Sequence, residues 1–301
     1  GLELIEGDGD DVVKFRGELA GVGQGVTVYQ VTPATEEASA FWRNEVAAAL
    51  RFNGGDFAAV LASAEFEHPT RGETILLCRA DNAEGPETLA DLMSKDDRTE
   101  ETVPLDIKVK ILVEVLQGVE TMARAGYIHT HLSPDAVLLS GDCMHPSRCH
   151  AQLEVFGYAR NIKRPARRAG RLHDNDFDAE RQYIAPEVAM EDSHGTHRDV
   201  WSLGVLFYEL VHAGLLPLRM YDPYETDEEF TEYVALRFNI ADDPDFKAFS
   251  KECPALARVL EQMLERDPRR RWGATHALRE LRKVARMFPS LQAWVDASGS
   301  H

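Results

Sequence analysis

The sequence predicts an α+β fold of two lobes, in which a small strand-rich lobe is followed by a larger helical one. The first third of the 301-residue chain alternates apolar and polar residues, a pattern typical of half-buried strands. From Leu89 onward, apolar residues recur with the helical period of about 3.6 residues. Turn residues at 81–86 separate the two patterns. We therefore predict a first lobe over residues 1–80, a second lobe over residues 81–296, and a linker-like tail at 297–301.

The first lobe is predicted to contain short strands and one main helix. Residues 12–15 and 26–31 read as strands on either side of a glycine-rich turn. A helix is predicted over residues 38–52. Two further strands follow at 57–66 and 74–80.

The second lobe is predicted to be mainly helical. Between residues 106 and 125 the apolar positions have a helical period, and they are Ile107, Ile111, Val115, Val119 and Met122. Residues 200–212 are almost entirely apolar, which is typical of a buried helix. Amphipathic patterns predict two more helices at 254–266 and 274–288.

The charge of the chain restricts its partners. It carries 51 acidic and 33 basic residues, a formal net charge of -18. An acidic surface argues against nucleic-acid and anionic-membrane binding. No run approaches the roughly 18 apolar residues that a membrane helix needs. We predict neither a nucleic-acid partner nor a transmembrane segment.

The four cysteines are too few for a scaffold built on disulfides. Cys143 and Cys149 lie in one predicted loop and are close enough in sequence to pair. They could equally remain buried or free thiols. A metal site with His145 and His150 is a third reading, although the spacing matches no common zinc pattern.

Five segments of the second lobe stand in an order that resembles the serine/threonine protein kinases. In chain order they resemble the catalytic loop, the Asp-Phe-Gly segment, the Ala-Pro-Glu segment, the start of the central helix and a late arginine motif. The segments are residues 127–139 (YIHTHLSPDAVLL), 155–157 (VFG), 185–187 (APE), 199–204 (DVWSLG) and 267–271 (DPRRR). This resemblance implies a bilobal protein-kinase fold.

A kinase must position the phosphates, neutralise their charge through metal ions and orient the attacking hydroxyl. By resemblance, His131 stands where an aspartate accepts the proton of the substrate hydroxyl. Ser133 stands where a lysine contacts phosphate. Ala136 and Val155 stand where an asparagine and an aspartate hold magnesium. Glu154 is adjacent, but on a strand its side chain would point to the opposite face from Val155.

The cation expected in the first lobe is also missing. Glu45 resembles the helix glutamate that pairs with a lysine of the preceding strand. That lysine position falls at Thr27, or at Val28 or Tyr29 if the register slips. None of these residues is basic.

The glycine-rich turn at 21–25 is a misleading candidate for a phosphate-binding loop, because it leaves no room for a third strand before the helix. The loop fits better at residues 7–11, behind Glu6. The carboxylates over residues 6–11 would repel a triphosphate. They could also form only a solvated acidic turn.

Structural residues of the kinase fold are kept. His129 and Phe156 resemble the hydrophobic column of the kinase core, and Asp199 resembles the carboxylate that holds the catalytic-loop backbone. Glu187 and Arg271 resemble a buried ion pair.

The segment after Gly157 starts with a basic run. Its members are Arg160, Lys163, Arg164, Arg167, Arg168 and Arg171, and acidic residues follow. The run could dock an acidic partner, or it could be a solvated loop neutralised by its own acidic half. Thr130 replaces the arginine that receives a loop phosphate in many kinases, so we predict no phosphorylation switch through that contact.

The degraded glycine loop and the His-Thr-His triplet resemble one branch in particular, the secreted rhoptry and dense-granule kinases of coccidian parasites, which include members without a glycine loop. The resemblance implies a secreted protein of the parasite dense granule, vacuole or cyst wall, with the cytoplasm as the alternative. An oxidising compartment would favour pairing of Cys143 with Cys149.

We therefore predict a pseudokinase that is not an enzyme and that acts as a protein-binding scaffold or allosteric adaptor. Its partner would be an active kinase or a protein of the vacuole or cyst wall. No magnesium-ATP, other cofactor or metal is predicted to bind. Two alternatives are a nucleotide-binding switch that works without metal, and an enzyme of altered chemistry that uses His131 or Asp135 as its base.

Overall fold

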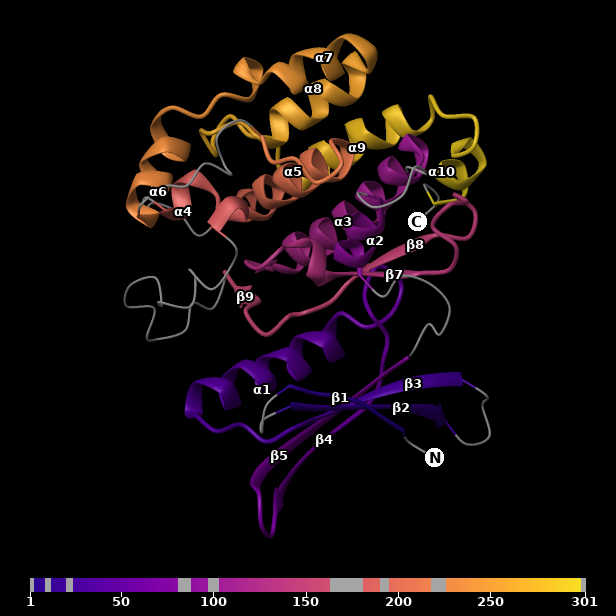
Figure 1. Cartoon of the computed structure of the whole chain (residues 1–301), viewed down its shortest axis with the longest axis vertical. Helices are drawn as coiled ribbons and strands as arrows, with labels where there is room; N and C mark the ends of the chain where they lie inside the picture. Colours follow the sequence, from indigo (N-terminus) through magenta and orange to yellow (C-terminus); the bar gives the residue numbers. More distant parts are fainter. Residues whose placement is uncertain are drawn as a thin grey trace.

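The computed structural model describes residues 3–8, 12–19, 24–80, 88–96, 103–162, 181–189, 195–217 and 226–298. Within these ranges the chain forms a strand-rich lobe and a larger helical lobe (Figure 1). The predicted α+β bilobal architecture is confirmed. The turn between the lobes, the basic run from Lys163 and the end of the tail lie outside the described residues.

The N-terminal lobe contains a five-stranded antiparallel sheet in the order β1-β2-β3-β5-β4. The strands are β1 Glu3–Asp8, β2 Val12–Leu19, β3 Gln24–Val31, β4 Val60–His68 and β5 Gly72–Ala80. Residues 9–11 of the predicted acidic loop lie outside the described residues, and its first two residues, Gly7 and Asp8, belong to the strand β1.

The helix α1, Glu36–Arg51, lies between the sheet and the C-terminal lobe (Figure 1). It begins where Thr35 accepts a hydrogen bond from the backbone N–H of Ala38, a side-chain cap that satisfies one of the free donors of the first turn. The register places Thr27 beside Arg79 and Tyr29 beside Leu77. Because alternate residues share one face of a strand, Thr27, Tyr29 and Arg79 lie on the same face of the sheet.

The C-terminal lobe is built around the buried helix α5, His197–Val211, which packs against α3, Leu105–Ala125. The other helices are α2 Leu89–Asp96, α4 Pro186–Ala189, α6 Asp227–Leu236, α7 Pro244–Glu252, α8 Pro254–Met263, α9 Ala274–Ala285 and α10 Gln292–Ser298. Short strands and 3-10 turns complete it: β6 Tyr127–Ile128, η1 Pro134–Ala136, β7 Val137–Ser140, β8 His150–Leu153, β9 Arg160–Asn161, η3 Arg181–Tyr183 and η4 Ile240–Asp242. Each helix that the apolar pattern predicted is present.

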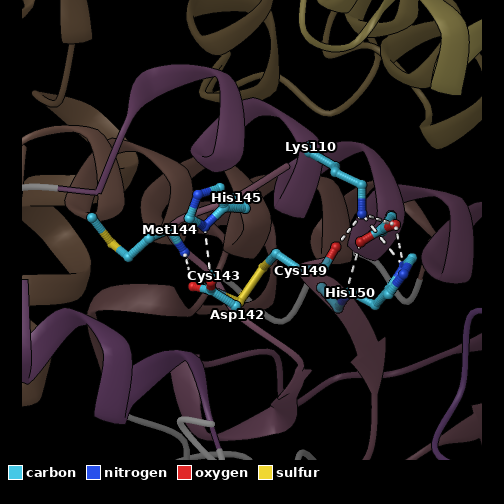
Figure 2. Close-up of a disulfide and its surroundings, with 9 residues drawn as sticks. Lys110, Asp142, Cys143, Met144, His145, Cys149 and His150 are labelled. Atoms are coloured by element: carbon cyan, nitrogen blue, oxygen red, sulfur yellow. Dashed lines mark hydrogen bonds and ion pairs between the residues drawn. A yellow bond between two sulfur atoms is a disulfide. The ribbon is translucent and has the colours of Figure 1, made fainter. Parts of the chain in front are cut away.

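Cys143 and Cys149 form a disulfide with a Cα–Cα distance of 4.4 Å (Figure 2). The bond decides between the readings that the sequence left open, because it removes both thiols as metal ligands. It closes the loop between β7 and β8, next to a buried lysine of α3. Lys110 donates to the carbonyl of Cys149 and pairs with Glu114 at 2.7 Å. The loop is therefore fixed to the helical core.

Among the residues that the structure covers, we find no helix with the combination of length and apolar character that crossing a membrane requires.

Candidate functional site

The backbone of the catalytic-loop segment is held by Asp199 at the start of α5. One carboxylate oxygen accepts from the N–H of His129 at 2.8 Å, and the other accepts from the N–H of Thr130 at 3.0 Å. Burial raises the pKa of Asp199, and the two backbone donors and the charge of Arg198 oppose that rise. Asp199 therefore fixes the loop, as the family resemblance implied for this position.

His129 is fully buried and touches Phe156, with ring centroids 5.5 Å apart. Its Nε2–H donates to the carbonyl of Glu154 at 2.9 Å, since a carbonyl oxygen can only accept. The other ring nitrogen, Nδ1, has no hydrogen-bond partner within the described part of the chain. Burial lowers the pKa of His129 to about 4, because a second proton would put an unpaired charge into the core.

This histidine should make stability depend on pH. Its pKa is about 4 in the folded chain and near 6.5 when exposed, so its contribution is complete above pH 6.5 and is lost as the pH falls toward 4. Between pH 7.5 and pH 5 we expect a loss of about 2 kcal/mol in the free energy of unfolding from this group. Urea titrations at both pH values measure the loss in the free energy of unfolding for the wild type and for His129→Phe. The difference between the two losses is the contribution of His129. Equal pH dependence in the two proteins would contradict the assignment.

His131, at the position of the catalytic base, stacks on Tyr158 with ring centroids 4.4 Å apart. The neighbouring Thr130 has a φ of 71° and donates its hydroxyl to the carbonyl of Tyr158 at 2.9 Å. A β-branched residue in this left-handed region is strained, at a cost of roughly 1–3 kcal/mol. The catalytic-loop segment is therefore tied to the chain after Gly157 without any phosphate.

The family resemblance implies magnesium, whose protein ligands are oxygen atoms. Ala136 and Val155 carry no side-chain oxygen, and Ala136 is buried in the turn η1. Ser133 begins that turn, and its carbonyl accepts from the N–H of Ala136 at 3.1 Å. Glu154, the carboxylate adjacent to Val155, is bound to an arginine. The described residues therefore do not fit the magnesium site of a protein kinase.

The prediction that Glu154 points to the opposite face from Val155 assumed that both residues lie on a strand, but β8 ends at Leu153. The φ of Val155 is 61°, so the chain leaves the extended conformation directly after Glu154, and strand alternation does not apply there. Glu154 instead points toward the sheet, where it forms an ion pair with Arg79 of β5.

Arg79 is the centre of a buried ion cluster between the lobes. Its guanidinium pairs with Glu45 of α1 through one terminal nitrogen and with Glu154 through the other. All three side chains are at most 12 % exposed, and the cluster holds two negative charges and one positive charge when ionised. Burial raises the pKa of Glu45, and the charge of Arg79 opposes that rise. Burial alone would lower the pKa of Arg79, but Glu154 and Glu45 raise it overall.

Arg79 was not found from the sequence. The sequence predicted the cation on the third strand, at Thr27. In the structure the guanidinium comes from the neighbouring strand, β5. Arg79 is the single basic residue in an otherwise apolar stretch, residues 75–80, and this is the signal that could have identified it. It takes the place of the absent lysine as the partner of Glu45.

The aromatic ring of Tyr29 lies next to this cluster. The ring of Tyr29 lies beneath the Arg79 guanidinium at 5.5 Å and is also approached by Lys14 at 5.8 Å. Both distances are within the range of a cation–π contact. Tyr29 also packs against the hydrophobic core.

Asn44 ties α1 to the segment after Val155. Its side-chain nitrogen lies within hydrogen-bond distance of the carbonyls of Phe156 at 3.2 Å, Gly157 at 2.7 Å and Ala159 at 2.9 Å. Phe41 packs so closely on Gly157 that a Cβ there would lie 2.0 Å from its ring, which only glycine allows. Helix α1 is therefore held inward by direct contacts with the C-terminal lobe.

Glu187 and Arg271 form a bidentate ion pair with distances of 2.7 and 2.9 Å. The Arg271 side chain is fully buried and also donates to the carbonyls of Glu265, His197 and Arg266. The pair joins α4 to the loop before α9.

A pocket of about 480 Å³ opens in the C-terminal lobe between α2, the turn η1 and the end of α5. Two carboxylates are part of its wall, from the exposed Asp135 and from Glu209, which accepts a hydrogen bond from Tyr183. Met93 and Leu215 add apolar surface. The pocket suits a ligand group with a positive charge and an aliphatic stem.

Residues 66–281 match the protein kinase domain family. The first 65 residues, which contain β1 to β3 and α1, precede the match. The match therefore covers β5 and the catalytic-loop region, but not the strand where the lysine was expected.

Known relatives are protein kinases. The chain is 28 % identical over 190 residues to 3-phosphoinositide-dependent protein kinase B of Dictyostelium discoideum, covering 63 % of this chain and 18 % of the relative. It is 29 % identical over 160 residues to human 3-phosphoinositide-dependent protein kinase 1, covering 53 % and 25 %. It is 26 % identical over 191 residues to serine/threonine-protein kinase PAK 4 of Mus musculus, covering 64 % and 28 %. The chain thus spans about a fifth to a quarter of these relatives.

These matches contradict the prediction that the chain is not an enzyme. The matched family and the relatives are protein kinases, which are transferases, and this places the chain in an enzyme class. The prediction rested on the residues that depart from the kinase motifs, namely Thr27, His131, Ala136 and Val155.

Proposed function

Because this chain belongs to the protein kinase domain family, we propose that it is a kinase domain that works mainly by binding another protein, as a scaffold or allosteric adaptor. In this proposal it is a pseudokinase in the sense that transfer of phosphate from magnesium-ATP is much weaker than in a kinase with the usual metal ligands. The proposed partner is an active kinase or another protein of the same compartment. The resemblance to coccidian secreted kinases makes a secreted, vacuolar or cyst-wall location part of the proposal.

The observation that carries the proposal is the ion cluster of Arg79 with Glu45 and Glu154. A triphosphate needs cations that are free to meet it, and a magnesium ion needs free carboxylates. Here the buried cation is paired with both carboxylates. A kinase keeps the pair between its cation and the helix glutamate while nucleotide is bound, so the pair with Glu45 alone excludes nothing. The pair with Glu154 is the one that binding of magnesium would have to break, and buried pairs are costly to separate.

The pocket beside Asp135 and Glu209 supports the protein-binding role. Its two carboxylates and apolar wall are complementary to an arginine or lysine side chain of a partner. We propose that the partner inserts a basic side chain there.

One experiment tests both parts of the proposal. Thermal unfolding is followed at increasing ATP concentrations, with and without magnesium. At a concentration of about 100 times the dissociation constant, a bound ligand would add about 2.7 kcal/mol to the free energy of unfolding. We expect no shift. A concentration-dependent rise in melting temperature would contradict the proposal.

In the second arm, a fluorescent arginine-rich peptide is titrated, and Asp135→Asn is expected to weaken its binding by about tenfold. Equal binding by both proteins would contradict the role of the pocket.

A second candidate is phosphoryl transfer by altered chemistry with His131 as the base. The matched relatives are protein kinases, which supports phosphoryl transfer in general and not this particular base. A metal-independent nucleotide switch is the other alternative. Steady transfer of phosphate to a protein substrate that is lost in His131→Ala would support the first. A rise in melting temperature with ATP alone, without transfer, would support the second.

A further inference from the structure

The sheet of the N-terminal lobe has one face that α1 does not cover. Thr27 and Arg79 lie on the face toward α1, so their neighbours Val28 and Cys78 lie on the opposite face. We call this the outer sheet face. It is directed away from the C-terminal lobe (Figure 1).

An apolar row crosses all five strands on the outer sheet face. The strand register joins the members of this row in sequence, namely Leu4, Phe15, Val28, Cys78 and Ala62. Leu4 is 61 % exposed, whereas Phe15, Val28 and Cys78 are half-buried. A solvated face of an antiparallel sheet usually carries polar residues instead. A row of this kind is typical of a face that is covered by another surface.

The outer sheet face is also uncharged. Among residues whose side chains the structure describes, its strand positions contain no Asp, Glu, Lys or Arg. The chain as a whole carries a net charge of -18. Two copies repel each other when acidic surfaces meet, and this repulsion is smallest where the meeting faces carry no charge.

The row is self-complementary in size. Its large residues, Leu4 and Phe15, lie toward one edge, and its small residues, Cys78 and Ala62, lie toward the other. A twofold axis that runs parallel to β3 beneath Val28 places Leu4 and Phe15 of one copy over Ala62 and Cys78 of the other. This is the arrangement that an isologous interface requires.

We propose that two copies of this chain form a dimer by packing their outer sheet faces together. Five strands spaced about 4.8 Å apart and paired over about six residues present roughly 500 Å² each. Two copies then bury about 1,000 Å², near the lower limit for a specific interface. The dimer should therefore be weak and concentration-dependent.

Sedimentation equilibrium from about 1 to 300 µM tests the proposal, a range chosen for the micromolar affinity of a small interface. We expect a reversible monomer–dimer equilibrium. Val28→Glu puts two carboxylates close to the twofold axis and should raise the dissociation constant by about 100-fold. The control Leu236→Glu introduces the same charge at a leucine that is 58 % exposed on α6, and it should leave the equilibrium unchanged. A monomer at every concentration would overturn the proposal.

A cross-link tests the geometry even if Val28→Glu folds poorly. In Phe15→Cys the introduced thiol should lie near Cys78 of the second copy, so mild oxidation should give a covalent dimer. The double variant Phe15→Cys with Cys78→Ser should give none. Equal cross-linking in both variants would overturn the proposed axis.

Discussion

Replacing Arg79 with leucine is expected to lower the free energy of unfolding by about 3–5 kcal/mol, because it leaves Glu45 and Glu154 buried without a counter-charge. Both carboxylates lie in the core between the lobes, and Glu45 already has a raised pKa from burial. The loss should remove the ion-pair link between α1 and the segment around Val155, while the contacts of Asn44 remain. For a chain of this size we expect a fall in melting temperature of roughly 5–15 °C.

Differential scanning calorimetry measures this loss. The matched control is Arg43→Leu, because Arg43 also pairs with two glutamates, Glu65 and Glu73, but on the surface. It should change the melting temperature little. The triple change of Arg79, Glu45 and Glu154 to leucine should recover most of the stability, since an apolar replacement of a buried ion cluster is often neutral. Equal losses for Arg79→Leu and Arg43→Leu would show that the cluster does not stabilise the fold.

Replacing Arg271 with leucine is expected to have a similar cost of about 3–5 kcal/mol. The change leaves the Glu187 carboxylate unpaired and removes the donor to the carbonyls of Glu265 and His197. Glu187→Leu should cost less, because Arg271 keeps its backbone acceptors. The order of the two losses therefore shows whether the backbone carbonyls still bind the Arg271 guanidinium when Glu187 is absent.

Chemical unfolding in urea of both variants measures this order. Arg270→Leu is the matched control, because Arg270 is the neighbour of Arg271 in sequence and also pairs with a glutamate, Glu265. The Arg270 side chain is 74 % exposed, so its ion pair lies at the surface. That control should unfold near the wild-type midpoint. A larger loss for Glu187→Leu than for Arg271→Leu would contradict this account of the pair.

Periodicity was sufficient to predict most helices and strands of the fold, whereas the protein-kinase fold itself was predicted from the order of the five motifs. The helical period of the apolar residues gave α3, and the unbroken apolar stretch gave the buried α5, because burial against a core leaves this pattern in a sequence. Four of the five strands described in the first lobe were predicted from alternation for the same reason. The strand β1 was not predicted, and its last two residues lie in the segment predicted as the loop at 7–11. The pairing of Glu187 with Arg271 followed from motif order, and the structure brings the two together.

The interior of the site could not be predicted in the same way. The Arg79 cluster depends on the register between β3 and β5, which no single segment encodes. The direction of Glu154 depends on the left-handed backbone at Val155, an unexpected conformation for a β-branched residue. Asn44 binds carbonyls more than one hundred positions away in the chain. Each of these features arises from contacts between distant parts of the chain rather than from a local pattern.

A crystal structure of the protein soaked with magnesium and a non-hydrolysable ATP analogue tests the central claim most directly. We expect the Arg79 guanidinium to remain between Glu45 and Glu154, with no nucleotide density in the cleft. A nucleotide seated between the lobes, with Arg79 turned onto its phosphates and Glu154 bound to magnesium, would contradict the account.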